Sequence, residues 1–458
     1  MKLHKKMGLI IIAYGVLVSS LNAKTLNSVT QNNTTLVPLR TIGEELGATI
    51  NFDPLTQKIT IHYKEQEVGL KLKDKKGMIN NEMHTLQVAP QSIDGTTYVP
   101  IRFIGEALGA TVDYKNGVLS MTSDDFSKQW QLETTNKVNQ SVPFKNTSTT
   151  VRGKRVTALA INMNDPKVKV KIATAGKKVT KAASIKSMAE GAKASINGTY
   201  FAAYNGDVPL PDGTIVSNGK VLHITDIGST IGFTKDNKVL IDFVQTRVQG
   251  YVNDEETWSS YRVNRPTPDT STTVIYTPEY EGNIPLPEGW SAVVCIDGKV
   301  AKIVTQTRTV PEKGFILTMV TERSGRFKVG DHVSYKTHYT PGNTAEEDWE
   351  EVVYALSAGP SLMINGALTG DPAKESFTEA KILNQVAQRS FIGTTKNNEL
   401  VIGTVSASVS ELKNIVKEMG LVSAMCLDGG ASSGLYYNGS YLTSPGRNVS
   451  NSINFFYN

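Results

Sequence analysis

A carboxylate, two glycines and two hydroxyls follow one another near the end of the chain, directly after an apolar stretch. Residues 421–427 are mostly apolar and predict a buried strand. The residues that could do chemistry come next: Asp428, Gly429, Gly430, Ser432 and Ser433. Glycine permits a close approach of the backbone to a ligand, and the serines supply hydroxyl and N–H groups. The pattern suits a site that holds an oxyanion or sugar hydroxyls beside a carboxylate, although an ordinary turn with solvated serines would explain the same residues.

Five further residues lie in stretches with the polar density of a binding site. These are Asn197, Arg265, Arg389, Arg447 and Asn451. An arginine is always cationic and matches a phosphate with two parallel donors. A purely structural role remains the alternative for three of them. Asn197 could cap a turn, Arg389 could be an exposed ion-pair partner, and Arg265 could lie in a loop without a ligand.

The composition is that of an ordinary globular protein. The chain has 458 residues, enough for two or three domains, and 48 Lys and Arg against 43 Asp and Glu give a net charge of +5. The basic residues are dispersed, so the charge does not indicate nucleic acid binding, but it would suit an anionic cell wall. Two distant cysteines and scattered histidines indicate neither a disulfide framework nor a metal site, and no cofactor is expected.

The first 23 residues have the features of a secretory signal peptide. Lys2, Lys5 and Lys6 precede an apolar stretch at 7–21, and small or polar residues follow. We therefore expect a secreted or wall-associated protein. An uncleaved membrane anchor is the alternative, although the stretch is slightly short to span a bilayer.

An internal repeat marks the segment that follows. Residues 37–49 recur in closely similar form at 99–111, each with a proline, a short amphipathic helix, a glycine stop and a strand. Residues 26–122 resemble the stalk-type domain named for the N-terminal domain of copper amine oxidases. The resemblance implies a wall-proximal spacer or binding module. His62 and His84 are isolated, so the name does not imply copper here.

The remainder predicts a linker and a larger domain. Residues 123–150 are polar without apolar periodicity and predict a linker. Strands dominate 151–458, and one helix at 408–419 begins with a capping box formed by Ser408 and Glu411. The expected fold class is α+β: a small repeat-containing α+β domain, a linker, and a larger β-rich mixed-sheet domain. The sequence does not decide whether 244–339 is a separate subdomain.

Residues 151–458 resemble the phosphodiester glycosidase family. The resemblance rests on the strand with L-D-G-G-x-S-S at 427–433, the turn G-R-x-V-S-N at 446–451, N-G-T-Y-F at 197–201 and R-x-x-x-G at 389–393. It implies a hydrolase that cleaves sugar-1-phosphodiesters. Asp428, Arg389 and Asn197 would then be catalytic. The remaining candidates would bind substrate: Gly429, Gly430, Ser432, Ser433, Arg447, Asn451 and Arg265.

The expected partners are carbohydrate rather than nucleic acid. A glycan or glycosyl-phosphate is the expected substrate, and a cell-wall polymer is its expected source; the oligomeric state is not indicated. A second catalytic carboxylate is not evident in the motifs. The alternative function is therefore a non-catalytic carbohydrate-binding or cell-wall scaffold protein.

Overall fold

The computed structural model describes eight stretches of the chain, which form two compact units. The stretches are residues 24–31, 34–53, 56–93, 96–115, 117–134, 143–204, 208–225 and 227–458. The units are Met1–Ser141 and Val142–Asn458. The predicted signal peptide lies outside the described residues. Within those residues, no helix has the length and apolar character needed to cross a membrane.

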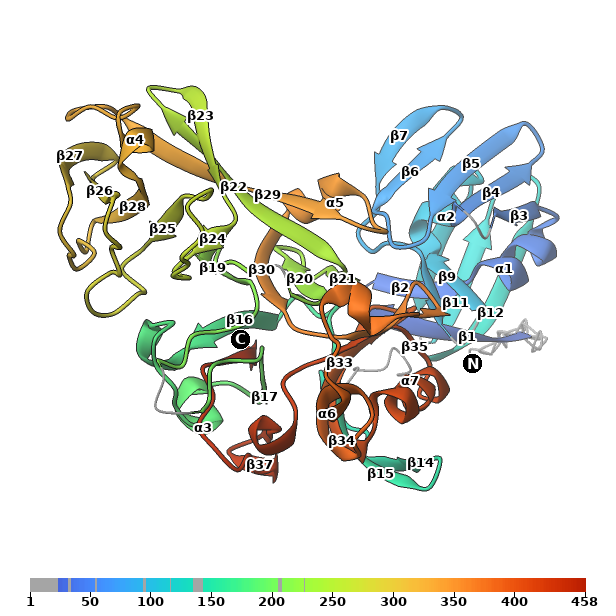
Figure 1. The fold of residues 1–458 in the computed structure, drawn as a ribbon. Helices are drawn as coiled ribbons and strands as arrows, with labels where there is room; N and C mark the ends of the chain where they lie inside the picture. Colours follow the sequence, from blue (N-terminus) through green and yellow to red (C-terminus); the bar gives the residue numbers. More distant parts are fainter. Residues whose placement is uncertain are drawn as a thin grey trace, which may run out of the picture. The chain divides into compact units, whose positions relative to one another are not determined.

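Both units are built mainly from β-sheet (Figure 1). Strands account for 51% and helices for 13% of the structure, so the expected β-rich character is confirmed and helices are a minor component. None of the sheets closes into a barrel. Every sheet therefore has edges, and the site described below lies where several strands end.

The first unit contains two sheets. The seven-stranded sheet has the order β10-β11-β12-β1-β2-β9-β8, and the second has the order β3-β4-β5-β6-β7. Their strands are β1 (Lys24–Gln31), β2 (Thr34–Pro38), β3 (Thr49–Asp53), β4 (Lys58–Tyr63), β5 (Gln66–Lys71), β6 (Lys76–Ile79), β7 (Glu82–Thr85), β8 (Gln91–Ile93), β9 (Thr96–Pro100), β10 (Thr111–Lys115), β11 (Val118–Thr122) and β12 (Ser127–Thr134).

Two short helices stand at the two copies of the sequence repeat. They are α1 (Leu39–Leu46) and α2 (Ile101–Ala107), and each directly follows a proline. Proline is tolerated there because the first N–H groups of a helix have no intrahelical partner. The predicted apolar faces, including Ile42 and Ile104, are buried in the core of the unit. Gly47 ends α1 with a φ of 81°, a conformation that glycine adopts without strain.

The predicted linker is largely structured. Within 123–150, β12 pairs with both β1 and β11, and Trp130 and Leu132 on it are buried. The two residues alternate with exposed ones in the pattern of a half-buried strand, which the polar composition of the segment hides. The end of the segment contributes strands to the second unit. The interpretation of 123–150 as a linker is therefore wrong for β12 and for residues 144–150.

The second unit contains five sheets. Their strand orders are β13-β15-β34-β33-β35-β31-β32 with β14 beside β15, then β16-β38-β17-β36-β37, β19-β18-β30-β20-β21, β23-β22-β29 and β24-β25-β28-β26-β27. The strands are β13 (Phe144–Asn146), β14 (Thr149–Val151), β15 (Lys154–Asn162), β16 (Val168–Thr174), β17 (Ala194–Asn197), β18 (Ile215–Ser217), β19 (Lys220–His223), β20 (Thr230–Thr234), β21 (Val239–Asp242), β22 (Val244–Val252), β23 (Glu255–Ser260), β24 (Arg262–Val263), β25 (Val274–Tyr276), β26 (Trp290–Ile296), β27 (Lys299–Val304), β28 (Gly314–Val320), β29 (Val333–Pro341), β30 (Val352–Ser357), β31 (Ser361–Ile364), β32 (Ala367–Leu368), β33 (Ala387–Thr395), β34 (Glu399–Ala407), β35 (Leu421–Cys426), β36 (Leu435–Tyr437), β37 (Ser440–Thr443) and β38 (Asn451–Tyr457).

Short helices connect these strands. They are α3 (Ile185–Met188), α4 (Thr321–Ser324), α5 (Glu346–Glu350), α6 (Ala380–Leu383) and α7 (Val409–Glu418), with 3₁₀ turns η1 (Ala175–Lys177), η2 (Pro372–Glu375) and η3 (Gly430–Ser432). The longest of them, α7, has the predicted capping box of Ser408 and Glu411. It packs through Leu412 and Ile415 and leads into β35, as the sequence predicts.

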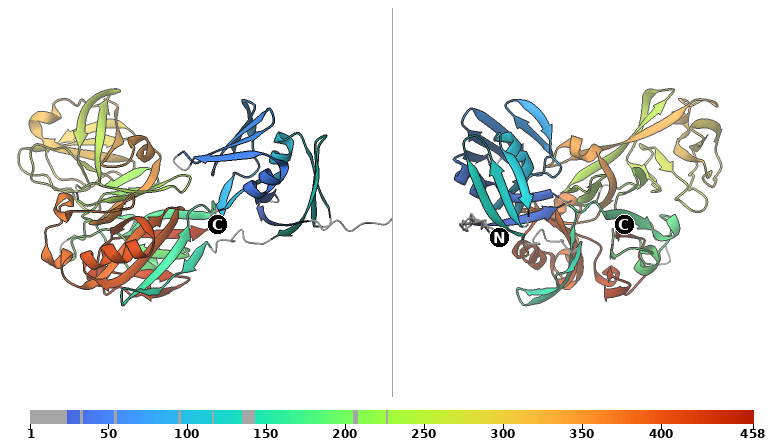
Figure 2. Two further views of the ribbon diagram at one scale, coloured as in Figure 1. Left: turned by 90° about the vertical axis from the view of Figure 1, so that its right-hand side faces the viewer. Right: turned by 180° about the vertical axis from the view of Figure 1, so that it is seen from behind.

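The beginning and end of the second unit lie side by side (Figure 2). Strand β15 pairs with β34, and β16 pairs with β38 along its whole length. One apolar core joins the two sheets of these strands to the sheet that contains β20, and it includes Ile231, Met425 and Ile453. The strands that end at the site are thus fixed by contacts between residues far apart in the chain.

The β-rich middle of the chain is an elaboration of the main sheets. Strands β22 and β29 pair over nine residues each and connect the main sheets to the β24–β28 sheet (Figure 1). The buried cluster beneath them includes Val248 and Leu317 from the middle and Val216 and Ala355 from the main sheets. A shared core of this kind means that the middle packs on the rest of the unit rather than folding apart from it.

Candidate active site

The pairing of β33 with β35 places Arg389 and Asp428 opposite each other. Phe391 pairs with Cys426, and the Leu427 N–H donates to the Ser390 carbonyl at 2.9 Å. Because the two strands are antiparallel, continuing this register sets Arg389 opposite Asp428. The two residues are far apart in the chain but adjacent at the same end of the sheet.

Asn197 holds the backbone of Asp428 rather than facing a ligand. Its side chain is fully buried, and its Nδ2 donates to the Asp428 carbonyl at 2.8 Å. Its Oδ1 accepts from the Ser390 hydroxyl at 2.7 Å and from the Gly434 N–H at 3.0 Å. The structure therefore does not bring the Asn197 side chain to the lining of the cavity described below, and its catalytic role stays a prediction. Asn197 is a positioning residue that fixes the loop carrying Asp428.

Asn197→Ala should destabilise the second unit by about 3 kcal/mol, because it leaves three buried polar groups without their partner. Chemical denaturation measured by near-UV circular dichroism would detect the loss. Asn414→Ala is the matched control, since Asn414 is exposed on α7 and only its Nδ2 bonds to a carbonyl of the same helix. The control should change stability by less than about 0.5 kcal/mol. Unchanged stability of Asn197→Ala together with lost catalysis would instead assign Asn197 to the reaction.

Asp428 has the electrostatics of an acid or base that works near neutral pH. Burial raises the pKa of Asp428 to about 7, because a carboxylate loses hydration there. Hydrogen bonds from the Ser432 hydroxyl and the Gly429 N–H, and the charge of Arg447, oppose the rise. The negative charge of Asp212 adds to it. A perturbed carboxyl group at a strand end beside a cavity is typical of functional sites.

Arg389 is a buried cation whose charge is not neutralised by a carboxylate within the described residues. Its Nη2 donates to the carbonyls of Gln385 at 2.7 Å and Lys381 at 3.4 Å, and its Nε donates to the Ala407 carbonyl at 3.2 Å. These bonds fix the guanidinium but leave Nη1 without a hydrogen bond in the described parts of the chain. A buried guanidinium with spare donors facing a cavity is suited to bind an anion.

Two glycines shape the loop around these charged groups. A β-carbon at Gly429 would lie 3.2 Å from the Gln388 carbonyl oxygen, a tight contact, and 3.5 Å from Arg389 Nη1, an ordinary one. Gly430 has a φ of 63°, which is strained for other residues. The predicted need for glycine at these two positions is therefore supported by the geometry.

Arg447 and Lys381 surround an exposed tyrosine at the cavity edge. The guanidinium carbon of Arg447 lies 4.9 Å from the centre of the Tyr204 ring, and Arg447 Nη2 donates to its hydroxyl at 3.2 Å. Lys381 Nζ lies 5.7 Å from the same ring. The hydrogen bond from Arg447 lowers the pKa of Tyr204. Together with Arg389, these cations make this side of the cavity positive.

A second carboxylate, which the sequence motifs do not reveal, lines the same cavity. Asp212 pairs with Arg265, whose Nη1 lies 2.8 Å from Asp212 Oδ1. The Asp212 N–H donates to the Tyr200 carbonyl at 2.8 Å, which closes the loop and turns the carboxylate toward the site. The only local signal in the sequence is an Asp-Gly turn, which is common and unspecific.

The cavity has a volume of about 580 Å³ and gathers six of the ten predicted site residues. It is lined by loops from several sheets. The predicted residues among the lining are Arg389, Asp428, Gly429, Gly430, Ser432 and Arg447. Residues not predicted from the sequence also line it, among them Tyr200, Tyr204, Asp212 and Lys381. The volume suits a ligand of one or two sugar rings with a phosphate.

Three predicted binding residues lie outside the cavity lining and bond to residues near it. Ser433 is buried and its hydroxyl donates to the Gln388 carbonyl at 3.2 Å. Asn451 is buried and its Oδ1 accepts from the Thr199 N–H at 2.9 Å. Arg265 holds Asp212. The structure does not bring these three residues to the cavity: their polar groups are engaged by the protein, and none of them lines it, so contact with a substrate stays a prediction.

Within the described ranges, no group of three or more His, Cys, Asp or Glu could hold a metal ion. One acidic residue of the cavity, Asp212, forms an ion pair with Arg265.

Comparisons with known proteins agree with the sequence motifs. The phosphodiester glycosidase family matches residues 291–456, and the copper amine oxidase N-terminal domain matches residues 20–122. The first match includes Arg389, Asp428 and Arg447, whereas Asn197 and Asp212 lie before it. No curated protein matches the chain.

Two solved structures share the fold at low sequence identity, and a third structure matches with a lower TM-score. A hypothetical protein from Synechocystis is 14% identical, with a TM-score of 0.61 over 95% of this chain and 99% of its own. A putative exported protein from Burkholderia pseudomallei is 14% identical, with a TM-score of 0.54 over 89% and 96%. The zebrafish N-acetylglucosamine-1-phosphodiester alpha-N-acetylglucosaminidase catalytic domain, auto-inhibited by its pro-peptide, is 12% identical, with a TM-score of 0.36 over 69% and 82%. Two segments of the chain are thus similar to known families: residues 20–122 match the copper amine oxidase N-terminal domain, and residues 291–456 match the phosphodiester glycosidase family.

Proposed function

We propose that the second unit is a glycosidase that hydrolyses sugar-1-phosphodiesters. The observation that carries the proposal is that Asp428 and Arg389 open on one cavity without pairing with each other within the described residues. An unneutralised guanidinium can bind the phosphate, and a carboxyl with a pKa of about 7 can act at the neighbouring anomeric carbon. The family match at 291–456 supports this assignment.

In the proposed reaction, water attacks the anomeric carbon and the bond from that carbon to the phosphate oxygen breaks. Ionised Asp428 accepts the proton of the attacking water and stabilises the positive charge that develops on the sugar. The electron pair of the broken bond leaves with the oxygen, which gives free sugar and a phosphomonoester. A phosphate is a good leaving group, so the reaction does not require a strong acid opposite Asp428.

The other lining residues have complementary roles in the proposal. Arg389 Nη1 binds the phosphate, and Arg447 and Lys381 add positive charge at the cavity edge. Asp212 accepts hydrogen bonds from sugar hydroxyls, with Arg265 holding it in place. The exposed face of Tyr204 packs against a sugar ring.

We further propose that the protein is exported and that its substrate is a sugar-phosphate group of a cell-wall polymer. The export proposal rests on residues 1–23 and the substrate source on the repeat-containing first unit. Amino-terminal sequencing of the protein recovered from outside the cell tests it. An amino terminus near Lys24 supports removal of residues 1–23 during export. An intact Met1 contradicts removal of this segment.

The proposed activity is tested by incubating the purified chain with a panel of sugar-1-phosphodiesters, including UDP-N-acetylglucosamine. Release of free sugar, slower by about 10²-fold or more in Asp428→Asn, is the expected result. Tight glycan binding without turnover, and unchanged by Asp428→Asn, would instead favour a carbohydrate-binding or scaffold protein. No release and no binding across a broad panel would contradict both functions.

Asp212→Asn and Arg447→Gln should shift the acidic limb of the pH profile of kcat/KM in opposite directions. The limb reports the ionisation of Asp428 in the free enzyme. Removing the negative charge of Asp212 makes ionisation easier and moves the limb to lower pH. Removing the positive charge of Arg447 moves it to higher pH. Shifts of the same sign in folded variants would show that another group controls the limb.

A further inference from the structure

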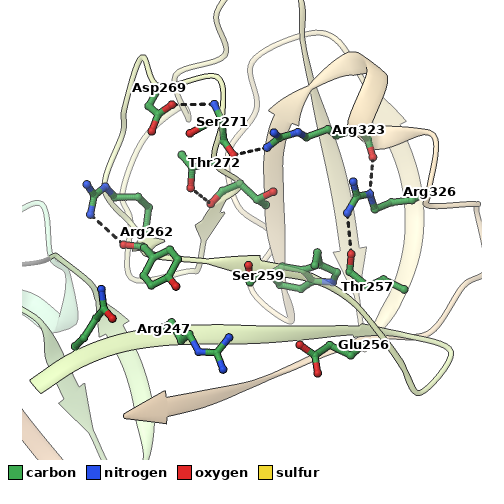
Figure 3. Close-up of a pocket in the computed structure, with 14 residues that line it drawn as sticks. Arg247, Glu256, Thr257, Ser259, Arg262, Asp269, Ser271, Thr272, Arg323 and Arg326 are labelled. Carbon is green, nitrogen blue, oxygen red and sulfur yellow. Dashed lines mark hydrogen bonds between the residues drawn. The ribbon is translucent and has the colours of Figure 1, made fainter. Parts of the chain in front are cut away.

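A second hollow, of about 980 Å³, lies in the inserted sheets of the second unit. It shares no lining residue with the cavity at Asp428. Figure 3 shows its floor along β22 and β23, with side chains from loops before β25 and near α4 around it. Nothing in the proposed hydrolysis uses this hollow, so its chemistry calls for a separate explanation.

Positive charge predominates among the residues that line the hollow. Four arginines face two acidic residues there, and they come from three different parts of the chain. Figure 3 shows Arg262 on one side of the hollow, Arg323 and Arg326 on the other, and Arg247 near the floor. Cations that converge on one space from several directions repel one another unless an anion lies between them.

Backbone carbonyls, rather than carboxylates, hold two of these arginines. Arg326 Nη1 donates to the Thr257 carbonyl at 2.7 Å, its Nε donates to the Arg323 carbonyl at 3.2 Å, and Arg323 Nη1 donates to the Ser271 carbonyl. A carbonyl orients a guanidinium without cancelling its charge. Neither arginine forms an ion pair within the described residues, so their charges remain available to a ligand.

Arg247 on β22 is the arginine least engaged by the protein. The residue is half-buried, and its guanidinium forms no hydrogen bond or ion pair in the described stretches of the chain. Hydrogen bonds with Ser271 are the main cause that lowers the pKa of Asp269 at the edge of the hollow, and the charges of Arg262 and Arg323 add to the lowering. The hollow thus favours negative charge.

We propose that this hollow binds a phosphate-bearing glycan or polyol chain. Phosphate groups match guanidinium donors two at a time, and a tetrahedral phosphate presents oxygens in several directions at once. Arginines on opposite sides of a hollow of this volume fit successive phosphates better than a single small ion. Ser259, Ser271 and Thr272 supply hydroxyls along the same surface for the units between phosphates.

Binding of an oligomer of glycerol phosphate, measured by calorimetry at low ionic strength, tests the proposal. The full chain carries Asp428→Asn throughout, so that turnover does not enter and the result does not depend on the proposed activity. Arg247→Gln should weaken binding about 5- to 10-fold, whereas Glu256→Gln, which removes a negative charge from the lining, should strengthen it. Added salt should weaken binding to the parent protein.

The matched control is Lys302→Gln, which removes an exposed positive charge from β27 outside the hollow. It should leave the affinity unchanged. Arg247→Gln is preferred to variants of Arg323 or Arg326 because it removes no bond that anchors a loop. Equal affinities of Arg247→Gln and its parent would overturn the site. Equally tight binding of polygalacturonate, which carries only carboxylates, would overturn the assignment to phosphate.

Discussion

Asp428→Asn is expected to lower kcat and kcat/KM together by about 10²-fold or more, which corresponds to about 3 kcal/mol of transition-state stabilisation. Asparagine keeps the size of the side chain but can neither accept a proton nor oppose positive charge on the sugar. Because these interactions develop in the transition state, KM should change little. Initial rates of the wild type and of Asp428→Asn, measured up to saturating substrate concentrations, give kcat and KM.

The same substitution should change the pH dependence. In the wild type, kcat/KM should rise with pH through an apparent pKa near 7, because the ionised form of Asp428 is the active one and burial raises its pKa. Asp428→Asn should lack this limb. Asp254→Asn, an exposed position in the turn between β22 and β23, is the matched control and should behave like wild type. Near wild-type turnover by folded Asp428→Asn would show that Asp428 is not catalytic.

Arg389→Ala is expected to raise KM at least as much as it lowers kcat, with a combined loss in kcat/KM of about 10²-fold. The phosphate is anionic both in the bound substrate and in the transition state. Loss of its contact with the Arg389 guanidinium therefore affects substrate binding as well as the rate. The guanidinium also fixes Gln385 and Ala407 through their carbonyls. Arg389→Lys should recover only part of the loss, because one ammonium group cannot make these bonds and also reach the cavity.

Thermal unfolding separates this effect from loss of structure, since Arg389 is buried and its removal also affects stability. Arg152→Ala is the matched control: Arg152 is exposed, and its nitrogen lies 3.6 Å from Glu418 in a surface ion pair. Its loss should change neither constant measurably. An Arg389→Ala enzyme that stays folded with an unchanged KM would show that the phosphate binds elsewhere.

The sequence predicts the part of the site that is local in the chain. Asp428, Gly429 and Gly430 follow one apolar strand, and their types alone indicate a ligand-binding turn. Asp212 escapes prediction because its place in the cavity depends on the contact between its loop and Tyr200. Asn197 and Asn451 are predicted at the site but bond to backbone groups, for a related reason. An amide at a strand end has the same appearance in sequence whether it binds a ligand or the backbone of a neighbouring loop.

The fold shows the same division between local and distant information. Helix α7 with its capping box is confirmed because its signals lie within a few residues. Strand β12 is missed because only pairing with β1 and β11 makes its polar segment a strand. The packing of β22 and β29 on the main sheets also depends on partners that no local pattern names.

The most direct test of the central claim is hydrolysis of a sugar-1-phosphodiester in ¹⁸O-labelled water, followed by mass spectrometry of both products. Attack at the anomeric carbon, with Asp428 as the base, predicts that the label appears in the free sugar and not in the phosphomonoester. Label in the phosphate would show that the phosphorus–oxygen bond breaks instead. That result would contradict the assignment of Asp428 to the anomeric carbon and of Arg389 to phosphate binding alone.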